Sequence, residues 1–546
     1  MDHVHPSELE DGRSGAGAEK TSRASRFCCR TALAWAVALT GVHLGLALPH
    51  LTSVPRAITD ESWEACTGYS LAYDGQLRNP VIYRYGIERA FVQPRITQSF
   101  VLAGAYRMLG VSLHSGRLAS VLVGWAAVIG VFYLMRTWLS YGASGLIALL
   151  VAVDTQFFLV TRTVRPEVYV LCVSVWMLAM LARGTVRPSF RRCFGAGLIG
   201  GVGCYTHPNT VLVIVPSLLL IVYAVGFRRQ LLSALAGYAL GGMVAVLPFF
   251  AYVAYAQAHH QVSFVEQLGS FYTSLAEQGT SNPLMRELRR WWSYFRPLER
   301  GPWVLLVAAG VVWGAVRRHP LQVWALILTL GHALLVLILI KSASPRYLVV
   351  LSPWFAAFVG VFVLQWWEWA RTLTPAKCRA MRALAVLCVC GTFALHLAGS
   401  AYVSHAYRQA DYDAVCRRIR HHIPSGSRIY GNLVFWTGLY QYPYLSEITY
   451  PQQPRVDQIV PVMRDRLGAF APQFVVRSSF SCHTLDGLGP RRAEFNRDTL
   501  RSPSYELIEA IQTRFCDRYI ARHLGVLLDR FTTRDFGTIE IYRLDW

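Results

Sequence analysis

The chain contains few charged residues for its size. Only 16% of its 546 residues are Asp, Glu, Lys or Arg, whereas 53% are hydrophobic. Soluble domains carry about a quarter charged residues, and apolar runs of about 20 residues are typical of membrane-spanning helices. The composition therefore excludes an ordinary soluble protein and predicts an α-helical polytopic membrane protein.

Several other classes lack their usual signals. The 12 cysteines form no CxxC pair and no metal-ligand spacing, so the sequence predicts no zinc site. The net charge of +21 comes without a basic motif that has interleaved aromatic residues, which argues against a nucleic-acid partner. The chain also shows no internal repeat. The excess of basic residues instead lies between apolar stretches, where it sets membrane topology.

The positions of the basic clusters choose between two topologies. If the short apolar stretch 96–110 lies on the outer surface, the clusters at 183–192, 228–229, 317–318 and 371–382 all become cytoplasmic, as the positive-inside rule requires. This assignment predicts about eleven spans, with the N-terminus inside and the C-terminus outside, in an integral protein of the cell (inner) membrane. The expected spans are 31–51, 117–135, 143–160, 166–182, 194–206, 209–226, 231–256, 302–316, 321–340, 347–369 and 381–403.

Three regions follow from this topology. Residues 1–30 are expected to form a disordered cytoplasmic tail, and 31–403 a transmembrane catalytic domain with a long outer loop at 52–116. Residues 404–546 are more polar and are expected to form a small extracytoplasmic α/β domain. Its predicted elements are a helix at Asp411–Ile423 and strands at Ser427–Tyr430, Gln473–Arg477 and Thr538–Arg543.

The acidic pair Asp60-Glu61 opens the first outer loop. A glycosyl transfer needs a base that takes the proton of the acceptor hydroxyl, and a carboxylate on the outer face fits that role. The alternative is an ordinary helix N-cap, because Thr-Asp-Glu-Ser precedes an amphipathic segment.

Further polar residues gather at the expected outer ends of the spans. Cations at the mouths of spans suit a lipid phosphate, and the candidates for this role are Arg162, Arg165, Lys341, Arg346 and Tyr347. Candidates for contacts with substrate are Tyr83, Tyr85, Glu88, Gln93, Asp154, Glu167 and His207. Interfacial anchoring, a salt-bridged turn, a buried partner for an arginine and a structural histidine remain the alternatives for these residues.

The order of these motifs resembles the GT-C membrane glycosyltransferases. It is most similar to the protein O-mannosyltransferase-like branch, which includes the bacterial aminoarabinose transferases. The matching pieces, in order, are Asp60-Glu61, Gln93-Pro94-Arg95, Arg162–Glu167, Thr206-His207-Pro208 and Pro345-Arg346-Tyr347. The chain departs from the pattern at Gln93, where the family has an acidic residue and a Lys.

The resemblance implies a GT-C fold and a sugar transfer outside the cytoplasm. The donor would be an undecaprenyl- or dolichyl-phosphate sugar, and the acceptor a hydroxyl on a lipid, glycan or protein. The resemblance implies inversion, with Asp60 as the base and Glu61 orienting it or the acceptor. No cofactor is expected to be required, and a divalent cation is left open. The rival hypothesis is a transporter or flippase of lipid-linked glycans, for which repeats and charges at the membrane midplane would be typical.

Overall fold

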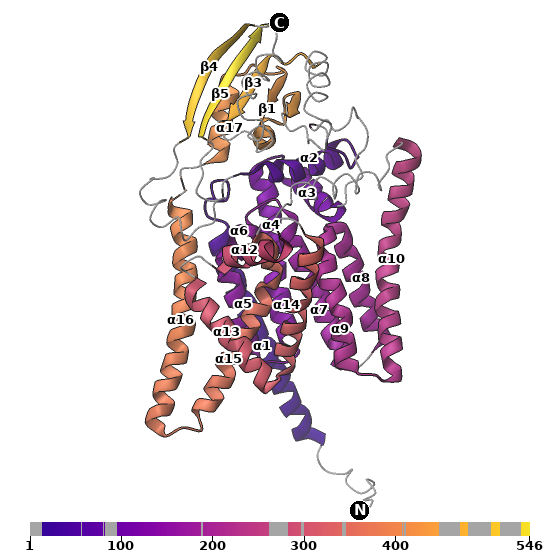
Figure 1. Ribbon diagram of the computed structural model, residues 1–546, viewed down its shortest axis with the longest axis vertical. Helices are drawn as coiled ribbons and strands as arrows, with labels where there is room; N and C mark the ends of the chain where they lie inside the picture. The colour runs from indigo at the N-terminus through magenta and orange to yellow at the C-terminus, as the bar shows by residue number, and fades with distance from the viewer. Residues whose placement is uncertain are drawn as a thin grey trace, which may run out of the picture.

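The computed structural model shows a helical bundle with a small β-sheet at one end (Figure 1). It describes residues 14–55, 57–79, 81, 95–186, 189–260, 282–295, 300–340, 345–406, 408, 411–446, 470–478, 504–513 and 537–545. Two helices, α2 (Thr59–Tyr73) and α3 (Ile96–Leu109), lie between the bundle and the sheet. The predicted fold class, a helical membrane domain with a C-terminal α/β domain, is confirmed.

The bundle consists of long apolar helices. They are α1 (Ser14–Ala47), α4 (Leu113–Met135), α5 (Tyr141–Val153), α6 (Thr155–Thr161), α7 (Pro166–Val186), α8 (Phe190–Thr206), α9 (Val211–Val225), α10 (Arg229–His260), α13 (Gly301–Arg317), α14 (Pro320–Leu339), α15 (Ser352–Ala370) and α16 (Pro375–Ala406). Two short 3₁₀ helices, η1 (Pro208–Thr210) and η3 (Pro345–Leu351), and the helix α12 (Pro283–Phe295) complete it. Helix α1 already begins at Ser14, inside the segment that was expected to be a disordered tail.

Eight of the described helices are long and apolar enough to cross a membrane, and α5 with α6 brings the number to nine if this pair, bent by 65°, is one span, against about eleven expected. The other two stretches expected to span correspond to α8 and α13, each 17 residues long and shorter than the eight. Helix α3 has 14 residues and lies at the sheet end, as expected for 96–110.

Glycines let two of these helices approach closely. A Cβ atom on Gly197 of α8 would lie 2.0 Å from the Tyr238 carbonyl oxygen of α10, and one on Gly241 of α10 would lie 2.0 Å from the Phe194 oxygen. Small residues allow such backbone contact in membranes, where packing rather than water drives helix association. This contact fixes α10 against α8 at the edge of the bundle.

The C-terminal sheet has the strand order β2-β1-β3-β5-β4. Strand β1 pairs in parallel with β2 and β3, whereas β5 pairs antiparallel with β3 and β4. The strands are β1 (Ile429–Gly431), β2 (Tyr444–Ser446), β3 (Phe474–Ser478), β4 (Ser504–Thr513) and β5 (Gly537–Asp545), with α17 (Tyr412–His421), η4 (Leu433–Phe435) and α18 (Trp436–Leu439) beside them. The three predicted strands correspond to β1, β3 and β5, and the predicted helix to α17.

The sheet domain shares a hydrophobic core with α2 and α3. Cys66, Leu102 and Tyr106 from the two helices are buried in one cluster with Tyr412 and Trp436. The Tyr69 ring also lies edge-on to Trp436, with 5.5 Å between the ring centroids. Because this core is continuous, the C-terminal domain holds in place the helix that carries Asp60.

Candidate active site

The start of α2 separates the two acidic neighbours. The Ile58 backbone N–H, at the N-cap position, donates to Glu61 Oε2 at 3.1 Å. Glu61 thus performs the capping that was the alternative role considered for the acidic pair. Asp60 makes no such contact, and 56% of its side chain is exposed. Successive helical residues point about 100° apart, which explains this separation.

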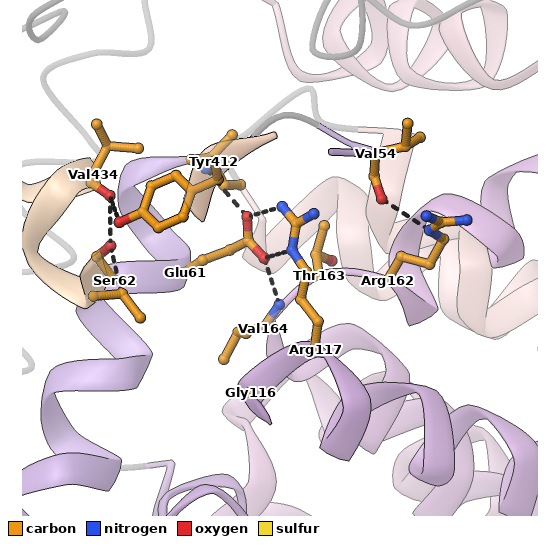
Figure 2. Close-up of polar contacts among 12 residues, drawn as sticks. Val54, Glu61, Ser62, Gly116, Arg117, Arg162, Thr163, Val164, Tyr412 and Val434 are labelled. Atoms are coloured by element: carbon orange, nitrogen blue, oxygen red, sulfur yellow. Dashed lines mark hydrogen bonds and ion pairs between the residues drawn. The ribbon is translucent and has the colours of Figure 1, made fainter. Parts of the chain in front are cut away.

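Glu61 is fully buried and bound on all sides (Figure 2). Arg117 donates to it through Nε at 2.9 Å and Nη2 at 2.8 Å, and the Val164 N–H donates to Oε1 at 2.9 Å. The same arginine donates to the Leu51 carbonyl at 2.7 Å. Glu61 was expected to orient Asp60 or the acceptor, and in the structure its carboxylate joins α2 to α4 and to the 162–165 turn.

Asp60, Arg165 and Glu167 form a cluster at the rim of the bundle, which we call the rim cluster. Arg165 is paired with Asp60, and its Nη2 lies 2.7 Å from Glu167 Oε1. Burial alone lowers the pKa of Arg165, but the two carboxylates outweigh it and raise this pKa well above its usual value. Arg165 is thus a fixed cation that orients both carboxylates.

Arg95, at the N-cap of α3, lies beside the rim cluster and was not among the predicted residues. It pairs with Glu64 of α2. Burial lowers its pKa, and the nearby Arg165 lowers it further, whereas Asp60 and Glu167 raise it. Three cations and three carboxylates, including Arg346 next to Glu167, therefore meet at this rim.

A small pocket lies beside Glu167. His207 and Tyr347, two of the predicted residues, line it together with Glu167. The complete lining is Pro166, Glu167, Val170, His207, Asn209, Leu212, His332, Tyr347 and Val350. Burial, followed by the charge of Arg95, lowers the pKa of His207 to about 3, so its ring is neutral. Its Nδ1 accepts the Asn209 N–H at 3.0 Å, so its Nε2 carries the hydrogen.

Two predicted residues do not join this site. Arg162 is fully buried and donates to the carbonyls of Val54, Leu46 and Pro49 at 2.8, 3.1 and 2.5 Å. It therefore ties down the chain that leads into α2, and Figure 2 shows its contact with Val54. The assignment of Arg162 to the donor phosphate is corrected accordingly, because its guanidinium is used by these three carbonyls.

Asp154 is buried at the break between α5 and α6. It accepts the Phe157 N–H at 2.8 Å and pairs with Arg300 Nη2 at 3.3 Å. A buried arginine partner was the alternative role considered for it, although Arg300 was not the arginine expected. Its assignment as a substrate contact is corrected, since both its charge and its capping capacity are used inside the protein.

Five predicted residues lie outside the described residues: Tyr83, Tyr85, Glu88, Gln93 and Lys341. Three residues that line the site were missed, namely Arg95, Asn209 and His332. The polar His332 in the middle of an apolar helix is the kind of signal that could have found it. Within the described part of the chain, no group of three or more His, Cys, Asp or Glu residues is arranged to hold a metal ion.

Comparisons with known proteins support the fold. Residues 93–255 match the family model described as dolichyl-phosphate-mannose-protein mannosyltransferase. No curated protein matches the chain in sequence.

Solved structures show the same fold. ArnT from Cupriavidus metallidurans bound to undecaprenyl phosphate is 15% identical, with a TM-score of 0.55, and the match covers 93% of this chain and 98% of that one. The Archaeoglobus fulgidus oligosaccharyltransferase in complex with Zn and sulfate is 12% identical, with a TM-score of 0.54, over 89% and 72% of the two chains. At these identities the matches establish the fold. The chain is an integral membrane protein with the GT-C fold, and its resemblance to the glycosyltransferases that use polyprenyl-phosphate-linked sugars is confirmed.

Proposed function

We propose that this protein transfers a sugar from a polyprenyl-phosphate-linked donor to an acceptor hydroxyl, with inversion and with Asp60 as the general base. The observation that carries the proposal is the contrast between two adjacent carboxylates. Glu61 is buried in an ion pair with Arg117. Asp60 is exposed beside the charged residues of the rim and is held in place by its ion pair with Arg165. An exposed, oriented carboxylate is what an incoming hydroxyl requires.

The proposed transfer forms one bond, breaks one bond and moves one proton. The acceptor oxygen attacks the anomeric carbon, and its proton passes to the Asp60 carboxylate. The bond between the anomeric carbon and the phosphate oxygen breaks, and polyprenyl phosphate leaves with the electron pair. Attack from the face opposite the leaving group inverts the anomeric centre. That no cofactor is required stays a prediction, and a divalent cation is left open.

The departing phosphate needs cations, and the rim offers several. Arg165 lies between two carboxylates, and Arg346, at the start of η3, adds positive charge near Glu167. Tyr347 follows it in the chain and reaches the pocket. We assign the lipid phosphate to Arg346 and Tyr347, with Arg95 nearby, and the acceptor to the exposed side of Asp60.

The orientation in the membrane is part of the proposal. The turns α9–α10 and α15–α16 lie at the end of the bundle opposite the sheet, together with the start of α1 (Figure 1). They carry Arg228 and Arg229, and Arg371, Lys377, Arg379 and Arg382. The positive-inside rule makes this end cytoplasmic and places the rim cluster and the C-terminal domain outside.

Labelling of single cysteines tests the orientation. In a variant without reactive native cysteines, an impermeant thiol reagent added to intact cells should label Arg418→Cys, which is exposed in the sheet domain, but not Arg228→Cys. Labelling of Arg228→Cys alone would reverse the topology and move the site to the cytoplasm.

Asp60→Asn tests the catalytic proposal. Asn keeps the shape of Asp but cannot take the proton, and a positioned base contributes about 10²–10⁴-fold to rate. We expect release of polyprenyl phosphate to fall by at least about 100-fold. Thermal stability should stay near wild type, because partly exposed ion pairs contribute about 0–1 kcal/mol.

The matched control is Asp74→Asn at the other end of α2. Asp74 accepts from Ser70 at 2.9 Å and pairs with Arg78, so this variant makes the same chemical change away from the rim. It should keep normal turnover. A folded Asp60→Asn protein with the turnover of the Asp74→Asn control would refute the assignment of the base.

A further inference from the structure

His332 is a polar side chain placed deep in an apolar helix. It lies on α14 about two turns before that helix ends at Leu339, which corresponds to about 10 Å of helix. Its side chain is 1% exposed, and neither ring nitrogen has a hydrogen-bond partner among the described residues. Buried polar atoms are nearly always hydrogen-bonded, since an unmet group loses its contacts with water without replacement.

The surroundings of His332 indicate which kind of partner it lacks. It lies in the lining of the small pocket with Glu167, His207, Asn209 and Tyr347, and both of its ring nitrogens are buried. The pocket continues from the rim cluster through Glu167, which belongs to both. A ligand held at the rim would therefore lie next to the pocket that His332 lines.

The charges around the pocket disfavour an anion. Glu167 carries a negative charge into the lining, and Arg165 compensates it. The cation that acts on His332 is Arg290 of α12, and this arginine is paired with Glu287. With each charge compensated, the pocket suits a neutral polar group better than a phosphate.

The chemistry of the lining fits a hydroxyl group. A neutral imidazole has one nitrogen that donates and one that accepts, and an alcohol can do both in return. The His207 Nε2–H adds a second donor. Because the pocket is about large enough for one water molecule, it has room for one hydroxyl group and not for a whole sugar ring.

We propose that this pocket receives one hydroxyl-bearing arm of the donor sugar and that His332 recognises it, which makes His332 a specificity-determining residue. The inference rests on the proposed function and extends it from the reaction to the choice of sugar. In this arrangement the phosphate of the donor lies at the rim with Arg346, and one side of the donor sugar faces α14.

A cycle of protein variants and donor analogues tests this. Dissociation constants are measured for the full-length protein in lipid nanodiscs with donors that carry a hexose, a pentose or an amino sugar, starting with dolichyl phosphate mannose. The tightest donor is then compared with its monodeoxy analogues and with the sugar-free polyprenyl phosphate. The proteins are wild type, His332→Ala and His332→Gln, which keeps one donor and one acceptor. His319→Ala, at the opposite end of α14, is the control.

One analogue should bind wild type about tenfold more weakly than the parent donor, which corresponds to the loss of a hydrogen bond of about 1.4 kcal/mol. His332→Ala should weaken the parent donor by the same factor and should not weaken that analogue further. His332→Gln should recover part of the loss. The sugar-free lipid phosphate should bind all four proteins equally.

Two results would overturn the inference alone. If His332→Ala weakens the sugar-free lipid phosphate as much as the donor, the pocket takes the phosphate. If the loss of affinity caused by His332→Ala adds to the loss caused by removing a hydroxyl, for every deoxy analogue, then no sugar hydroxyl contacts His332. Failure of the proposed function is distinct, since wild type would then bind neither the lipid phosphate nor any donor, and both proposals would fall.

Discussion

The rim cluster and the Glu61–Arg117 pair contain the same types of side chain but differ in how far their carboxylates are exposed. Each joins carboxylates to an arginine, and their acidic residues are adjacent in the chain. The Glu61 pair is fully buried and its oxygens accept from Arg117, Ile58 and Val164. Asp60 keeps more than half of its side chain exposed. A carboxylate with every contact made inside the protein stabilises the fold, whereas one left open can act on a ligand.

The Asp154–Arg300 pair belongs to the sealed kind. Both side chains are almost completely buried, and Arg300 also donates to the Tyr294 carbonyl at 2.8 Å. Asp154 caps α6 where the span bends by 65°. Helix α6 leads directly into the turn that carries Arg165. The two buried ion pairs thus fix the start of α2 and the α5–α6 break, and these segments lead to the residues of the rim cluster.

The largest effect on stability should come from breaking the buried Glu61–Arg117 pair. Glu61→Ala leaves Arg117 buried without a countercharge, and breaking such a pair costs about 3–5 kcal/mol. We expect a large fall in thermal stability and in the yield of folded protein. The measurement is thermal unfolding in nanodiscs, compared with Asp74→Ala, whose exposed pair should matter little. Equal stability of the two variants would contradict the distinction between sealed and open pairs.

Asp154→Asn should have an intermediate effect. Asn can still accept the Phe157 N–H but leaves Arg300 without its countercharge, for a loss of about 1.5–3 kcal/mol in unfolding free energy. Replacing Arg300 by Met in the same protein should recover part of this stability, since the unpaired charge is then gone. Turnover per folded molecule should remain near normal. A strong loss of turnover without a loss of stability would instead support Asp154 as a contact with substrate.

The smallest effect is expected at Arg346, on the open side. Arg346→Ala should raise the KM for the lipid donor by about tenfold, which corresponds to about 1.4 kcal/mol for a charge-assisted contact. Stability should hardly change, since Arg346 is only partly buried. Arg371→Ala, at the far end of α15, is the matched control. An unchanged KM in the folded variant would remove Arg346 from the phosphate.

Much of the fold could be predicted from the sequence because it depends on local periodicity. The apolar runs match the bundle helices, and three predicted strands correspond to β1, β3 and β5. Strands β2 and β4 were missed. Strand β2 is three residues long and, among the described strands, pairs with β1, so its conformation depends on a partner elsewhere in the chain. The break at Asp154 was also missed, although the polar residues Asp154-Thr155-Gln156 interrupt the apolar run 143–160.

The candidate site was predicted in part, for a related reason. Asp60, Arg165, Glu167, His207, Arg346 and Tyr347 do meet at one rim, because each follows or precedes a span at the same end of the bundle. Arg162 stands in the same turn as Arg165, yet its guanidinium is used by three carbonyls. Residue type and membrane side do not reveal which way a side chain points within a turn.

The sequence by itself therefore determined the membrane class, the end of the bundle where polar residues gather and the resemblance to GT-C enzymes. These properties follow from hydrophobic run lengths, charge placement and motif order, which are all linear in the chain. Only the tertiary structure decided that Glu61 is sealed by Arg117, that Asp60 is open, and that the C-terminal domain shares a core with α2. The physical reason is that burial and pairing depend on segments far apart in sequence. Arg117 lies on another helix, and Tyr412 and Trp436 come from the opposite end of the chain.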